Sequence, residues 1–137
     1  MGVWMSGVRK MLIIASTALL LSACGAVGKG GGLFGPAPSP AEQKLASGVK
    51  SYEEGDYYVS LSAFQSALGM GLSKKDDQVL AYKYSAFIHC VSGRDKQCRD
   101  AFKKAIEIDP TFDLKPSEAG HPIWGPVFRS VKGQSVK

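Results

Sequence analysis

The stretch GDYYVSLSAFQSA, residues 55–67, returns 38 positions later in the chain as GRDKQCRDAFKKA, residues 93–105. Each copy opens on a glycine, carries a phenylalanine at its tenth position and closes on an alanine. Four pairs of small or aromatic residues share the offset: Gly48 and Ala86, Ser60 and Cys98, Phe64 and Phe102, Ala67 and Ala105. Because self-similarity at a fixed period is typical of repeat architectures, the two stretches predict two copies of one structural unit.

Each unit has the apolar periodicity of two helices joined by a turn. Apolar or small residues recur three or four positions apart, which is the spacing of one face of an α-helix. They fall into four groups: Leu45, Val49 and Tyr52; Leu61, Phe64, Ala67 and Leu68; Leu80, Tyr84, Phe87, Ile88 and Val91; Cys98, Phe102, Ala105 and Ile106. Since no stretch shows the two-residue alternation of a strand, the chain is predicted to be all-α.

Helix ends can be predicted from capping residues and glycines. Ser39, Pro40 and Glu42 form a capping box with proline at the first helical position, so the first helix should begin there. Turns are expected at Gly55-Asp56, at residues 69–71 and at Gly93. Asp76 or Asp77 is predicted to cap the third helix, and the fourth should stop at residues 109–110.

The repeat resembles the tetratricopeptide repeat, whose period is about 34 residues. The four extra residues fit a longer connection near residues 73–77, and Pro110 ends the second unit as that family expects. Leu72 stands where the first unit would carry its proline, and Lys44 and Tyr82 replace the large aromatic near each start. The resemblance implies two helix-turn-helix repeats over residues 39–111.

The tail, residues 112–137, is predicted to cap these repeats. Two units bury little surface by themselves, and solenoids usually need three or more. Trp124, Val127, Phe128 and Val131 are spaced to form a short helix that docks on the last repeat. The alternative is a disordered or partner-binding tail.

The N-terminal residues resemble a bacterial lipoprotein signal peptide. Arg9 and Lys10 precede an apolar run over residues 11–21. This run is shorter than the roughly 20 residues that a helix needs to span a membrane. Leu-Ser-Ala-Cys at residues 21–24 looks like a lipobox. The resemblance implies cleavage of residues 1–23, from a start at Met1 or Met5, and attachment of acyl chains such as palmitate to Cys24.

Residues 24–38 are rich in glycine and proline and are interpreted as a flexible tether. Gly25 follows the lipidated cysteine, and by analogy with enteric sorting it favours the outer membrane over the inner. The expected location is therefore the cell envelope, lipid-anchored and facing the periplasm.

With Cys24 lipidated, Cys90 and Cys98 are left as a pair in an oxidising compartment. One lies near the end of a predicted helix and the other near the start of the next, across the Gly93 turn, so their Cα atoms can approach to about 6 Å. We expect a disulfide; the alternative is two free buried thiols.

The sequence gives little support for nucleic-acid binding, catalysis or metal binding. The 17 basic and 12 acidic residues are scattered without a basic stripe, so no nucleic-acid partner is expected. His89 and His121 are the only histidines, and neither belongs to a recognisable nucleophile–base arrangement. We therefore predict no enzyme activity, no catalytic residue, no cofactor and no metal site.

In a repeat of this kind, the first helix of each unit lines a groove. This places eight residues in a predicted partner-binding groove: Leu45, Val49, Tyr52, Glu53, Leu80, Lys83, Phe87 and Val91. Apolar anchors with a few charges suit a peptide or a partner helix. The same residues could instead be buried against the tether or the tail.

Four stretches are more specific than the repeat: FIHCVSGR (87–94), QCR (97–99), Asp109-Pro110 and EAGHPIWGPVF (118–128). Together with the lipobox they resemble the TssQ family of type VI secretion-associated lipoproteins. The resemblance implies a non-enzymatic adaptor or scaffold that binds envelope proteins, such as subunits of the secretion membrane complex. The alternatives are a lipoprotein for pilus or outer-membrane protein assembly and, in another class, a periplasmic enzyme or cell-wall binder.

Overall fold

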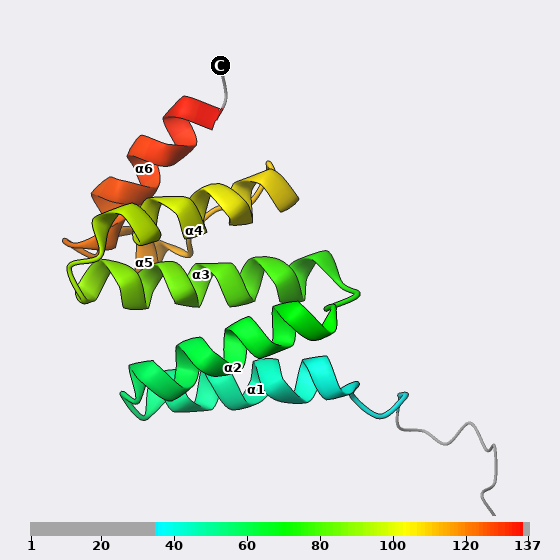
Figure 1. The fold of residues 1–137 in the computed structure, drawn as a ribbon. Helices are drawn as coiled ribbons and strands as arrows, with labels where there is room; N and C mark the ends of the chain where they lie inside the picture. Colours follow the sequence, from blue (N-terminus) through cyan, green and yellow to red (C-terminus); the bar gives the residue numbers. More distant parts are fainter. Residues whose placement is uncertain (1–34, 136–137) are drawn as a thin grey trace, which may run out of the picture. The chain divides into compact units, whose positions relative to one another are not determined.

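The computed structural model describes residues 35–135 of the chain, and this part contains helices and no strand. Six helices follow one another in Figure 1: α1 (Pro40–Glu53), α2 (Tyr57–Met70), α3 (Lys75–Val91), α4 (Asp95–Ile108), α5 (Pro116–Ala119) and α6 (Trp124–Ser135). The all-α prediction is confirmed. The predicted signal peptide, Cys24 and the predicted tether as far as residue 34 lie outside the described residues.

The turns and most caps form where the sequence predicts them. Ser39 Oγ accepts the Glu42 N–H at 3.2 Å, and the Glu42 carboxylate accepts the Ser39 N–H at 2.7 Å, which completes the capping box of α1. Gly55 turns the chain at φ +82°, and the Asp56 carboxylate then accepts the Val59 N–H to cap α2. Gly71, at φ +87°, ends α2, because that backbone conformation strains other residues.

The predicted cap of α3 is wrong. The helix begins at Lys75, and Lys74 occupies the cap position without a side-chain cap hydrogen bond. Asp76 and Asp77 lie inside the first turn instead. Carboxylates at that position still stabilise the helix, because they face the positive end of its dipole.

The helices form two hairpins, α1 with α2 and α3 with α4, which makes the fold repeat-like (Figure 1). The small residues of the repeat lie where paired helices approach each other. Ser60 Oγ, on α2, donates to the Gly48 carbonyl on α1 at 2.8 Å, and the pair is buried. A Cβ at Gly48 would lie 2.6 Å from the ring of Phe64, so only glycine fits this crossing.

The C-terminal segment packs on the second hairpin, as predicted. The ring of Phe128, on α6, lies 5.2 Å from that of Phe102 on α4, measured between centroids. Trp124 stacks on Phe87 of α3 at 4.3 Å. Phe128 and Val131 are buried in the same apolar cluster as Phe87 and Phe102, so the tail completes the core of the second hairpin.

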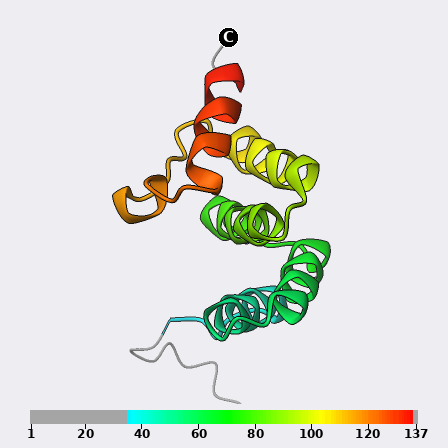
Figure 2. The ribbon, with the colours of Figure 1, turned by 90° about the vertical axis from the view of Figure 1, so that its left-hand side faces the viewer.

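Figure 2 looks roughly along α1 to α4 and shows α2 and α4 on one side of the stack and α5 on the other. The four-residue helix α5 was not predicted from the sequence.

No helix among residues 35–135 has both the length and the apolar character needed to cross a membrane.

Candidate functional site

The predicted groove is open over only part of its length. A cavity of about 460 Å³ lies between α1 and α3 and includes four of the eight predicted residues: Leu45, Val49, Glu53 and Leu80. Leu45 is only 5 % exposed, so it belongs to the floor, while Val49 and Leu80 are half-buried and accessible. We call this cavity the α1–α3 groove.

The C-terminal segment covers the neighbouring stretch of α3. The ammonium of Lys83 lies 2.6 Å from a carboxylate oxygen of Glu118 on α5, and both side chains are largely buried. Phe87 is 2 % exposed beneath the indole of Trp124. Lys83 and Phe87 are therefore engaged by the tail, which is one of the alternatives that the sequence left open.

The other two predicted residues, Tyr52 and Val91, lie outside the lining of the α1–α3 groove. The ring of Tyr52 packs between those of Tyr57 and Tyr84, at 5.7 and 4.7 Å between centroids. Val91 is half-buried and is the last residue of α3. Neither lines the α1–α3 groove, so the structure brings together four of the eight residues in one open surface.

The unpaired charges on the rim of the α1–α3 groove are acidic. Glu42 is paired with Lys74 at 2.6 Å, and the Lys74 ammonium together with the Ser39 hydrogen bonds lowers the pKa of Glu42 to about 2. Lys50 lies 3.7 Å from Glu54. Glu53 and Asp77 form no ion pair within residues 35–135, so two carboxylates flank an apolar floor.

The surroundings of Tyr84, on α3, shift the pKa of its hydroxyl. Burial raises the pKa of Tyr84, and the negative charges of Glu118 and Glu53 raise it further. A tyrosine hydroxyl is protonated at neutral pH even without such a shift, so Tyr84 remains a hydrogen-bond donor.

The predicted disulfide between Cys90 and Cys98 is confirmed. Their Cα atoms lie 5.0 Å apart, within the usual range for a bridge, and both side chains are buried. The bond joins the last turn of α3 to the first turn of α4 across Gly93, and it fastens the second hairpin.

The two histidines lie in different surroundings. His89 is half-buried on α3, where burial and the nearby Arg94 charge lower its pKa. His121 stacks on Trp124 at 3.3 Å, and its Nδ1 accepts the Ile123 N–H. In the part of the chain that the structure describes, no group of three His, Cys, Asp or Glu side chains could hold a metal ion.

Sequence reasoning missed the contact made by α5. Lys115, Pro116 and Glu118 repeat the pattern of a helix start, with proline at the first helical position and glutamate two residues later. That pattern could have predicted the helix. The partner of Glu118 lies 35 residues away in the sequence, and no local pattern indicates it.

Comparisons of the chain with family models, with curated proteins and with solved structures find no match.

Proposed function

We propose that this protein is a lipid-anchored adaptor of the bacterial envelope, which holds a protein partner in the α1–α3 groove as an accessory of a type VI secretion system. The observation that carries the proposal is the groove itself. It combines an apolar floor at Val49 and Leu80 with the unpaired carboxylates of Glu53 and Asp77. Such a surface suits a peptide or helix with apolar anchors and basic neighbours.

Two features support a place outside the cytoplasm. The Leu-Ser-Ala-Cys motif ending at Cys24 is typical of a lipoprotein signal. The Cys90–Cys98 disulfide is of a kind that persists in oxidising compartments and is rare in the cytosol. Gly25 favours the outer membrane by analogy with enteric sorting.

The type VI assignment depends on the resemblance of residues 87–94, 97–99, 109–110 and 118–128 to the TssQ family. The structure supplies a reason for these stretches to occur together. Phe87, Cys98 and Phe128 belong to one buried cluster, and Trp124 packs against it. The quoted motifs therefore describe one packed unit, the second hairpin with its cap.

The adaptor's mechanism is positioning. Acyl chains on Cys24 would hold the domain at a membrane, since two or three chains anchor stably. A tether over residues 24–38 would let the groove reach partners on the order of 20 Å away. Confinement of this kind raises the effective concentration of the groove near envelope proteins without any new contact.

Envelope capture with matched variants tests this function. Full-length protein is purified from cross-linked envelopes as wild type, as Glu53→Gln/Asp77→Asn and as the control Asp76→Asn/Asp95→Asn. The control also removes two carboxylate charges, and both of its positions are exposed and lie outside the groove lining. The groove variant should capture a secretion membrane-complex subunit several-fold less than wild type and control.

Two results would count against the proposal in different ways. Equal capture by both double variants would remove the groove from the mechanism. Enrichment of pilus or outer-membrane assembly components in place of secretion subunits would favour the alternative kind of assembly lipoprotein.

A further inference from the structure

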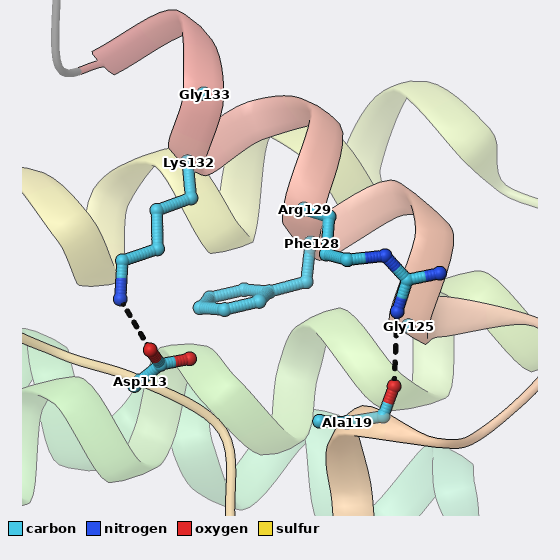
Figure 3. A pocket seen from close by; sticks show the side chains of 7 residues that line it. All are labelled: Asp113, Ala119, Gly125, Phe128, Arg129, Lys132 and Gly133. Carbon is cyan, nitrogen blue, oxygen red and sulfur yellow. Dashed lines mark hydrogen bonds and ion pairs between the residues drawn. The ribbon is translucent and has the colours of Figure 1, made fainter.

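A second cavity lies at the other end of the domain, along α6 (Figure 3). Its volume is about 600 Å³, within the range of about 300–1,000 Å³ that is usual for ligand sites. Six residues form most of its wall: Asp113, Ala119, Gly125, Phe128, Arg129 and Lys132. We call it the α6 cavity. It shares no residue with the α1–α3 groove.

The floor of the α6 cavity is apolar and fixed by packing. The ring of Phe128 is held edge-to-face by Phe102 and Phe112, at 5.2 and 5.5 Å between centroids. Gly125 sets one wall, because a Cβ there would lie 2.5 Å from the Ala119 carbonyl oxygen. Gly133 sets another, and a Cβ at Gly133 would meet only open space.

Two cations flank the ring, and only one of them is neutralised. The Lys132 ammonium donates to the Asp113 carboxylate at 2.7 Å and to the Phe112 carbonyl at 2.9 Å, and this contact lowers the pKa of Asp113. Arg129 donates through one Nη to the Ala119 carbonyl at 3.2 Å (Figure 3). Its other N–H groups have no partner within residues 35–135, so the rim has one unmatched positive charge.

We propose that the α6 cavity binds a single-chain amphiphile with an anionic head group, of the class of long-chain carboxylates. The apolar chain lies in the cavity along Ala119, Gly133 and the small part of Phe128 that is exposed, and the carboxylate accepts hydrogen bonds from the free N–H groups of Arg129. Guanidinium and carboxylate form strong paired hydrogen bonds. An acyl chain suits the floor better than a peptide, because it brings no backbone polar groups that would need partners there.

Photo-labelling tests this assignment independently of the adaptor proposal. Full-length protein in phosphatidylcholine vesicles is irradiated with a diazirine-bearing hexadecanoate, and adducts are located by mass spectrometry. Wild type should be labelled within residues 113–133. Gly133→Leu adds a side chain at the cavity wall, where a Cβ meets no atom within 4 Å, and it should lose roughly tenfold of the labelling. Arg129→Gln should lose as much, through its lost charged hydrogen bonds.

Matched controls separate the cavity from general effects on the protein. Gly69→Leu changes another helical glycine with open space around it, and Arg99→Gln removes an exposed arginine outside the cavity lining. Both should be labelled like wild type. Unlabelled hexadecanoate should compete, whereas the neutral hexadecanol should not.

Three results would overturn the assignment. They are equal labelling of Gly133→Leu and wild type, equal competition by hexadecanol, and labelling that only a peptide with an apolar C-terminal residue displaces. Unchanged thermal unfolding of Gly133→Leu excludes loss of the fold as the cause of reduced labelling.

Discussion

At the scale of single residues, the missing side chain of Gly48 decides how closely α1 approaches α2. The Phe64 ring fills the space where a Cβ would be, and it is completely buried. The Gly48 carbonyl is at the same time the acceptor for the buried hydroxyl of Ser60. One position therefore determines both the packing and the polar contact of this crossing.

Gly48→Ala should lower the free energy of unfolding by about 1–3 kcal/mol, because overpacking moves the ring or separates the helices. Gly69→Ala provides the comparison, since its Cβ meets nothing within 4 Å and it should raise stability by up to about 1 kcal/mol. Urea titration followed by circular dichroism measures both. Equal stability of the two variants would show that the crossing tolerates a methyl group.

The ion pair between Lys83 and Glu118 is the second feature at this scale. Lys83 also lies over the rings of Tyr84 and Phe87, at 4.8 and 5.7 Å from their centroids. Lys83→Met keeps the packing but leaves the Glu118 carboxylate without its partner. The free energy of unfolding should fall by about 3 kcal/mol. Lys104→Met, at an exposed pair, should change it by less than about 1 kcal/mol.

At the scale of elements, the N-terminus of α1 is tied to the connection between α2 and α3. The Glu42 carboxylate caps its own helix and also accepts a hydrogen bond from Lys74. The pKa of Glu42 is lowered from its ordinary 4.5 to about 2 by these contacts. The contribution to stability is therefore present above pH 4.5 and is lost as the pH falls from 4.5 toward about 2.

Glu42→Gln should remove this pH-dependent contribution. The variant should be less stable than wild type at pH 6, and the two unfolding curves should converge near pH 2. Urea midpoints measured in steps between these pH values give the comparison. A constant difference across the whole range would mean that Glu42 acts through its shape and not through its charge.

The second hairpin depends on its disulfide as the first depends on Ser60 and Gly48. Cys90 and Cys98 are eight residues apart, and closing a loop of this size stabilises a fold by roughly 2–3 kcal/mol. Reduction should lower the free energy of unfolding of wild type by that amount. In Cys90→Ala/Cys98→Ala, reductant should have no effect; a matching shift there would point to a cause other than the bond.

At the scale of the whole molecule, the hairpins and the docking of the tail on the last repeat could be predicted from the sequence, whereas the contacts that the tail makes with α3 could not. Helix ends depend on nearby residues: Ser39 with Glu42, and the glycines at 55, 71 and 93. The core face of each helix follows from apolar spacing. The site depends on longer contacts, because Glu118 and Trp124 cover Lys83 and Phe87 from more than 30 residues away.

The tail also changes which residues can test the function. Phe87 was predicted as a groove residue, yet it is buried under Trp124, so Phe87→Ala would damage the core. Removal of a buried phenylalanine costs about 3–5 kcal/mol. Accessible residues of the α1–α3 groove, such as Ala46, are the sound probes.

The central claim is that the α1–α3 groove holds a partner in the envelope. A photo-cross-linking amino acid is placed at Ala46 in the groove and, as a control, at the exposed Ser62 on α2 of the full-length protein. Irradiation of whole cells should yield a discrete adduct with a secretion membrane-complex subunit from position 46 and none from position 62. Adducts of equal yield from both positions, or none from position 46, would contradict the account.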